Sequence, residues 1–168
     1  DAVMLSGETA SGKFPVQSAT LMARIAEATD GEIESKLAGR KTHCETTGAQ
    51  DVIGLAAELL ARDLKACAIV AATMSGETAR FVSMSRPDCE VIALSPVQKS
   101  RRRMALYRGV LPMGVPELKD QDVLASEASD IVKQSGLGKP GDLMVLVFGA
   151  PMGSGVRANT VRLARIGD

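Results

Sequence analysis

Apolar and polar positions divide this chain into short hydrophobic runs separated by segments of helical periodicity. The runs at residues 67–73, 90–95 and 142–149 are almost continuously apolar, which is typical of strands covered on both faces. The segments between strands show helical patterns, at residues 77–85, 97–106 and 122–136. Parallel strands need such helical crossovers. The order therefore predicts an α/β fold: a three-layer domain with a mostly parallel five-stranded sheet and helices on both faces.

The remaining strands and the preceding helix complete this prediction. Residues 109–115 read as a strand that Pro112 places near a sheet edge, because proline cannot donate to the ladder. Residues 159–166 read as the last strand, and Gly136 as the stop of the helix before the 142–149 strand. Apolar residues from Ile53 to Leu64 line one helical face. Thr46 or Thr47 is the expected N-cap of that helix.

The first residues form a separate unit in this pattern. Residues 2–5, AVML, read as a short buried strand, and Pro15 suits the first position of a helix. Residues 2–28 therefore predict a strand, a loop and a helix. The polar, glycine-containing segment that follows reads as a linker with a broken helical turn. Because the chain opens directly on this strand, we expect it to be a piece of a longer protein.

Composition limits the classes of partner. The 168 residues are 45% hydrophobic and 24% charged, and the 20 Lys and Arg balance the 20 Asp and Glu. This balance disfavours general attraction to nucleic acid or membrane. The three cysteines have no paired spacing, which favours free thiols in a reducing compartment such as the cytoplasm. His43 and Cys44 are adjacent, but without further ligands they predict no metal site.

The pentapeptide SGETA occurs twice, at residues 6–10 and 75–79. In the second copy a helix begins near Gly76, where unpaired amides and the helix dipole favour an anion. Hydroxyls of Thr73, Ser75 and Thr78 add donors, and Gly76 lets a ligand approach closely. This pattern predicts a phosphate cradle, with simple capping of the helix by Ser75 as an equal alternative. The first copy reads as an ordinary loop, in which Ser6 or Glu8 could touch a reacting group.

A glycine-rich loop follows the 142–149 strand. Residues 149–160 read GAPMGSGVRANT, and the loop can close over a ligand in the cradle, with the amides of residues 153–156 and the hydroxyl of Ser154 as donors. Arg157 could supply charge. A flexible connection to an antiparallel last strand is the favoured alternative. The basic run KSRRR, at residues 99–103, favours a solvated helix face or a subunit contact over a phosphate patch.

The motifs DAVMLSGETASGKFPVQSATLMARI, VAATMSGETARFVSMSRP and DLMVLVFGAPMGSG…NT resemble pyruvate kinases, in order and across the whole chain. The resemblance implies that residues 1–28 are the last strand and helix of a catalytic (β/α)8 barrel. Residues 29–168 would be the C-terminal allosteric domain, within a cytoplasmic tetramer. The parent enzyme would transfer a phosphoryl group from phosphoenolpyruvate to ADP, using Mg²⁺ and K⁺.

The same resemblance implies roles for individual residues. Ser6 matches a serine near the proton path and would act as a relay, with Glu8 in the same motif. The other catalytic and metal-binding residues lie on earlier barrel strands, so we expect this chain alone to be inactive and metal-free. A sugar phosphate or AMP is the implied effector, held by one half-site at Thr73, Ser75, Gly76 and Thr78 and another at Gly153, Ser154 and Gly155.

Two residues depart from the family pattern, and two other functions stay open. Met74 stands where some members carry a basic residue, and Glu77 adds negative charge. The effector could therefore be a bisphosphate or a monophosphate, it could bind weakly, or the site could have no effector. The alternatives to an enzyme fragment are a stand-alone module that binds a phosphorylated metabolite and an oligomerisation domain without a ligand.

Overall fold

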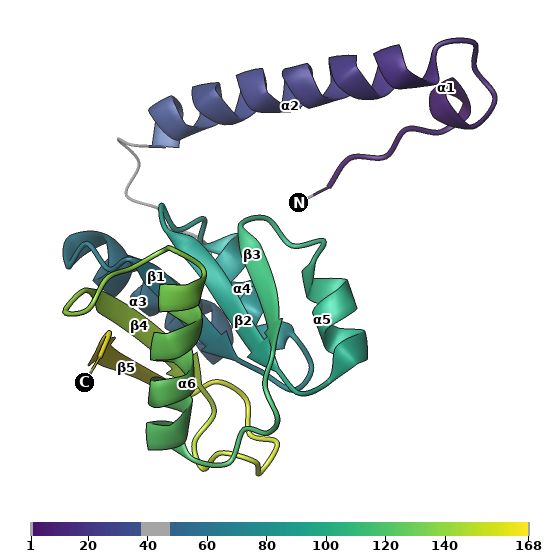
Figure 1. Ribbon diagram of the computed structural model, residues 1–168. Coiled ribbons are helices and arrows are strands. Elements are labelled where there is room, and N and C mark those ends of the chain that lie inside the picture. The colour runs from purple at the N-terminus through teal and green to yellow at the C-terminus, as the bar shows by residue number, and fades with distance from the viewer. Residues whose placement is uncertain (1, 38–47, 168) are drawn as a thin grey trace. The chain divides into compact units, whose positions relative to one another are not determined.

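The computed structural model describes residues 2–37 and 48–167 of the chain (Figure 1). Its contacts divide the chain into two compact units, Ala2–Glu45 and Thr46–Asp168. The second unit contains the sheet and its covering helices. The expected N-caps Thr46 and Thr47 and the pair His43–Cys44 lie outside the described residues.

The sheet of the second unit has five strands in the order β3-β2-β1-β4-β5 (Figure 1). The strands are β1 (Ala68–Ala72), β2 (Glu90–Ser95), β3 (Val110–Gly114), β4 (Leu143–Phe148) and β5 (Thr160–Arg165). Neighbours are parallel except β4 and β5, which pair antiparallel with Phe148 opposite Thr160. The predicted fold class is confirmed, including the edge position of the strand that contains Pro112.

Burial follows the position of each strand in the sheet. Every residue of β1 is buried, and only the first residue of β2 and of β4 is not. The edge strands β3 and β5 have mixed exposure and no fully buried residue. A central strand carries apolar side chains on both faces because helices cover both. The continuous apolar runs in the sequence thus mark the central strands.

Helices cover the two faces of the sheet (Figure 1). The core under α3 (Ala49–Asp63), α4 (Glu77–Met84) and α5 (Gln98–Met104) contains Ala57, Val82 and Met104. The other core contains Leu124, Ala128 and Val132 of α6 (Gln121–Gln134). Helices α3 and α4 also pack closely, since a Cβ on Gly54 would lie 2.7 Å from the carbonyl oxygen of Phe81.

The first unit contains α1 (Gly7–Ala10) and α2 (Pro15–Leu37). The helix predicted from Pro15 is confirmed, but two other predictions are wrong. Residues 2–5 form no strand, because a strand needs a neighbour and the described sheet consists of β1 to β5 alone. Residues 29–37 continue α2 and are not a linker. One glycine in a helix costs about 1 kcal/mol, and the helix-forming Glu, Lys and Leu residues of this segment compensate for that cost. Among the described helices, none is long and apolar enough to cross a membrane.

Glu58 on α3 is a buried carboxylate with one satisfied oxygen. Its Oε1 lies 3.1 Å from Nη1 of Arg62, one turn further along the helix. Its Oε2 is buried and has no hydrogen-bond partner in the described part of the chain. Burial raises the pKa of Glu58, and this effect outweighs the lowering by Arg62, while Asp88 and Asp63 add to the rise.

Glu58 should therefore make the stability of the second unit depend on pH. A raised pKa in the folded state means that the contribution of this group is full below the unfolded pKa of about 4.3 and is lost as pH rises through the folded value. In Glu58→Gln the side chain cannot ionise. We expect the free energy of unfolding, variant minus wild type, to be larger at pH 7 than at pH 4. Urea denaturation at several pH values measures this difference, and a difference independent of pH would contradict the account.

Candidate functional site

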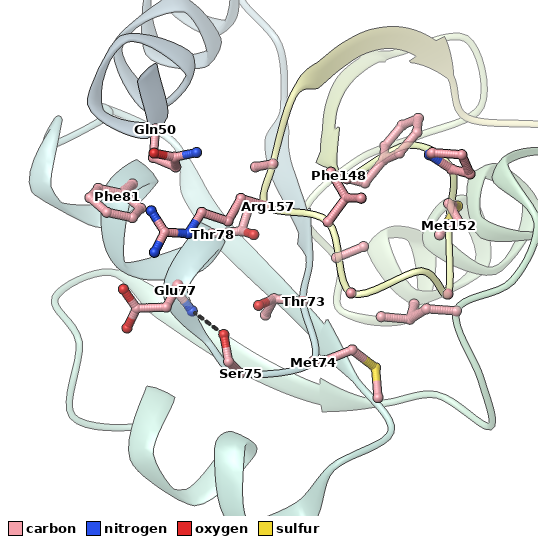
Figure 2. Close-up of a pocket in the computed structure, with 18 of the residues that line it drawn as sticks. Gln50, Thr73, Met74, Ser75, Glu77, Thr78, Phe81, Phe148, Met152 and Arg157 are labelled. Atoms are coloured by element: carbon pink, nitrogen blue, oxygen red, sulfur yellow. Dashed lines mark hydrogen bonds between the residues drawn. The ribbon is translucent and has the colours of Figure 1, made fainter. Parts of the chain in front are cut away.

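A cavity of about 660 Å³ lies at the carboxyl ends of β1 and β4. The chain proceeds from β1 through β2 to β3 on one side of the sheet and then places β4 on the other side of β1. Such a reversal leaves a crevice beyond the ends of the two strands, where ligands of open α/β sheets bind. The residues that line the cavity come mainly from the segment after β1 and from the loop after β4 (Figure 2).

The segment between β1 and α4 forms one wall of the cavity. The amide of Gly76 donates to Oγ1 of Thr73 over 2.9 Å. The amide of Glu77 donates to Oγ of Ser75 over 3.4 Å (Figure 2). Gly76 has φ +91°, and a Cβ there would lie 3.0 Å from Cγ of Met104. The turn therefore needs glycine, both for its left-handed backbone and for its packing on α5.

The first turn of α4 retains donors that face the cavity. The amide of Thr78, a residue that lines the cavity, precedes the first bond within the helix and has no partner among the described residues. Thr78 is only 8% exposed and lines the cavity, yet its hydroxyl has no hydrogen-bond partner in the described part of the protein. A nearly buried hydroxyl without a partner normally pairs with water or a ligand. Together these donors and the helix dipole suit an anion.

The loop after β4 forms the opposite wall. Gly153 and Gly155 line the cavity with φ values of +77° and +74°. At the base of the loop, a Cβ on Gly149 would lie 2.2 Å from the carbonyl oxygen of Val156. The two ends of the loop therefore approach each other too closely for any side chain at this position. The loop also leads into β5, which pairs antiparallel with β4 as the alternative interpretation of this segment predicted.

Asn159 closes this loop, and the sequence reasoning did not single it out. Its Oδ1 accepts from the amide of Ala150, and its Nδ2 donates to the carbonyl oxygen of Ala150, both over 2.8 Å. The amide of Asn159 also donates to the carbonyl oxygen of Phe148. The sequence shows an asparagine just before the last strand, which could have indicated a side chain that bonds to the loop. Its partner, Ala150, can be identified only in the folded loop.

Helix α5 braces the first wall from outside the cavity. The hydroxyl of Ser100 donates to the carbonyl oxygen of Met74 over 2.7 Å, and the guanidinium of Arg103 donates to the carbonyl oxygen of Ser75. Arg101 donates to the carbonyl oxygen of Ser95 at the end of β2 over 2.7 Å. The basic run on α5 therefore does more than face solvent, because two of its arginines hold backbone carbonyls at this edge of the sheet.

The charged residues that line the cavity are Glu77, Arg80 and Arg157. Arg80 pairs with Glu77 at 3.3 Å, and its guanidinium carbon lies 4.8 Å from the centre of the Phe81 ring. Arg157 extends from the loop toward the side of the cavity where Thr78 and Phe81 lie (Figure 2). It forms no ion pair or hydrogen bond with any residue that the structure describes. Arg157 is thus a cation available to a ligand.

The structure brings most residues of the two predicted half-sites to one cavity, but not all of them line it. Thr73, Ser75 and Thr78 face the same cavity as Gly153 and Gly155. Gly76 shapes the first wall without lining the cavity, and the hydroxyl of Ser154 donates to the carbonyl oxygen of Pro151. Gln50, Phe81 and Met152 also line the cavity, and no local motif marks them as site residues.

Ser6 and Glu8 lie in the first unit. The amide of Ser6 donates to Oε2 of Glu8 over 3.0 Å, and hydrogen bonds from backbone amides lower the pKa of this exposed carboxylate. The hydroxyl of Ser6 has no hydrogen-bond partner among the described residues. The first SGETA copy is thus a capped turn at α1, and a proton path through Ser6 would need further groups.

Comparison with known proteins gives one consistent result. The sequence model described as "Pyruvate kinase, alpha/beta domain" matches residues 51–164. The chain is 41% identical to a pyruvate kinase of Clostridium acetobutylicum, over 90% of this chain and 32% of that protein. It is 36% identical to a pyruvate kinase of Geobacillus stearothermophilus, over 100% of this chain and 29% of that protein. The chain therefore spans about a third of the length of these relatives.

Solved structures agree with the sequence relatives. A crystal structure of a pyruvate kinase from Cryptosporidium parvum matches with a TM-score of 0.73 at 27% identity. The match covers 98% of this chain and 32% of the chain in that structure. A second crystal structure of pyruvate kinase from the same organism gives a TM-score of 0.69 at 26% identity.

Replacing Asn159 should loosen the glycine-rich loop without unfolding the sheet. Asn159→Ala removes both side-chain hydrogen bonds to Ala150, each worth about 1 kcal/mol or less at an exposed site. We expect faster amide hydrogen exchange at Ala150 and unchanged exchange at the β1 amides. Asn159→Asp retains the acceptor but sets a carboxylate oxygen against the carbonyl oxygen of Ala150, so exchange at Ala150 should also be faster than in wild type. Equal exchange in all three proteins would show that Asn159 does not hold the loop.

Proposed function

Since this chain belongs to the pyruvate kinase family, we propose that it is the C-terminal part of a pyruvate kinase that binds a phosphorylated effector. The parent enzyme would transfer a phosphoryl group from phosphoenolpyruvate to ADP, giving pyruvate and ATP. The family assignment and the partial coverage of its relatives support a parent protein with further segments. The observation that carries the effector site is the cavity, where the unpartnered hydroxyl of Thr78 meets the first turn of α4.

The proposed ligand is a sugar phosphate or AMP. Its phosphate would accept hydrogen bonds from the amide and the hydroxyl of Thr78. The hydroxyl of Thr73 accepts from Gly76 and still has its own proton to donate. The amides of Gly153 and Gly155 would approach from the other wall, and Arg157 would balance the charge. Ser75, Gly76 and Ser154 would shape the two walls.

The catalytic parts of the parent enzyme are proposed to lie elsewhere. No three His, Cys, Asp or Glu side chains converge in the described part of this chain. Mg²⁺ and K⁺ would be held by the rest of the barrel, with Ser6 as a relay near the proton path and Glu8 beside it. Val16, Leu21 and Ile25 on α2 are more than half exposed. Their exposure supports packing against further segments of a larger barrel, and the parent enzyme is proposed to be a cytoplasmic tetramer.

Effector binding can be tested by thermal denaturation with glucose 6-phosphate, ribose 5-phosphate, fructose 1,6-bisphosphate and AMP. A ligand at 100 times its Kd stabilises the folded state by about 2.7 kcal/mol. We expect stabilisation by at least one of these compounds. It should weaken in Thr78→Val and vanish in Ser75→Asp, where a carboxylate repels the phosphate.

Ser126→Asp is the matched control, because Ser126 is exposed on α6 and does not line the cavity. This variant should respond to the ligand like wild type. A response that survives Ser75→Asp would place the phosphate elsewhere. No response to any compound in wild type would leave a structural or oligomerisation role for this domain.

The 168-residue chain should show no pyruvate kinase activity by itself. Phosphoryl transfer depends on positioning and metal electrostatics, and the chain spans only about a third of the length of its pyruvate kinase relatives. A coupled assay of pyruvate formation from phosphoenolpyruvate and ADP, with Mg²⁺ and K⁺ present, measures this. Turnover above the uncatalysed background that persists after repurification would contradict the prediction.

A further inference from the structure

The basic side chains around the cavity differ in how many contacts they already make with other residues of the protein. Arg103 lies behind the first wall and donates to the carbonyl oxygen of Ser75. Lys119 lies near the glycine-rich loop, since its Cγ is 3.9 Å from the Cβ position of Gly153, and its ammonium pairs with Glu117. Neither side chain lines the cavity. The cations that do line it are Arg80 and Arg157.

Arg80 is held by contacts within α4. Its Nη2 lies 3.3 Å from Oε2 of Glu77, and its Nη1 lies 3.8 Å from the sulfur of Met84. Its guanidinium also stacks on Phe81. Exposed ion pairs are individually weak, but three contacts on one guanidinium together favour this orientation. Glu77 both neutralises Arg80 and adds negative charge to the first turn of α4, beside the donors of Thr78.

The charge of the cavity matches one phosphate group. Glu77, Arg80 and Arg157 leave a net charge of one positive at the lining, to which the helix dipole adds about half a charge. A phosphate monoester carries about 1.5 to 2 negative charges at pH 7. A second phosphate would double the ligand charge while Arg157 is the only lining cation without a partner among the described residues. The volume of about 660 Å³ has room for a small ligand with either one or two phosphates. Charge and not size therefore distinguishes the two kinds of ligand.

We propose that Glu77 makes this cavity selective for ligands with a single phosphate, by holding Arg80 and by repelling a second phosphate. This inference rests on the proposed effector site and names its ligand class. It covers sugar and nucleoside monophosphates alike, because the selection acts on charge. In Glu77→Gln the carboxylate charge is lost and Arg80 becomes free to pair with a second phosphate.

The test is calorimetric titration of the 168-residue chain with ligand pairs that differ by one phosphate. Fructose 6-phosphate is compared with fructose 1,6-bisphosphate, and AMP with adenosine 3′,5′-bisphosphate. In wild type, the monophosphate of the pair that binds should bind more tightly than its bisphosphate. Glu77→Gln should tighten the monophosphate about threefold and the bisphosphate about tenfold, because Coulomb energy scales with ligand charge.

Two further variants separate the causes. Glu90→Gln is the control, since Glu90 is an exposed carboxylate at the start of β2, and it should bind like wild type. Glu77→Gln combined with Arg80→Gln should lose the added affinity for the bisphosphate, because the released cation is then missing. Raising the ionic strength should reduce the difference between Glu77→Gln and wild type.

A wrong effector site and a wrong role for Glu77 would give different binding results. If wild type binds neither member of either pair, the effector site itself is wrong, and the selectivity inference falls with it. If wild type binds a bisphosphate as tightly as its monophosphate or more tightly, the effector site stands and the selectivity inference is wrong. Equal gains for both ligands in Glu77→Gln would also overturn the role given to Glu77.

Discussion

Burial of the central strands on both faces is the constraint on which this structure depends. β1, β2 and β4 are almost entirely buried, and their side chains need helices on both sides of the sheet. Helical crossovers supply that cover and make these strands parallel, so that their carboxyl ends meet at one edge. The reversal of strand order between β1 and β4 then opens the cavity at this edge. The site is thus a consequence of how the core is covered.

Backbone geometry forms the cavity more than charged side chains do. The donors on the α4 side are amides of a first helical turn and hydroxyls next to them, and Gly76 gives this turn its left-handed backbone. The opposite wall depends on Gly149, which has no room for a side chain, and on Asn159, which joins the ends of the loop. Ser100 and Arg103 hold the carbonyl oxygens behind the first wall. Only a few charged side chains line the cavity, so Glu77 and Arg157 have a large effect on the charge of the ligand that it prefers.

The sequence by itself determined the elements of the second unit, their order and half of the site. Continuous apolar runs identified the central strands, Pro112 identified an edge, and SGET after a strand identified the start of α4, because each signal is local. The same reasoning was wrong at residues 2–5, where an apolar run without a neighbouring strand forms no strand. It was also wrong at residues 29–37, where helix-forming residues outweigh one glycine.

Only the tertiary structure decided which distant groups share the cavity. The support of Met74 and Ser75 by α5 and the contribution of Gln50 join segments far apart in the chain. The contact of Asn159 with Ala150 spans nine residues and also requires the folded loop. The pairing of Arg80 with Glu77 is local to α4, whereas the presence of Arg157 at the same cavity depends on the fold of the sheet. Local patterns report what each segment prefers alone, whereas these contacts exist only after the sheet has brought the segments together.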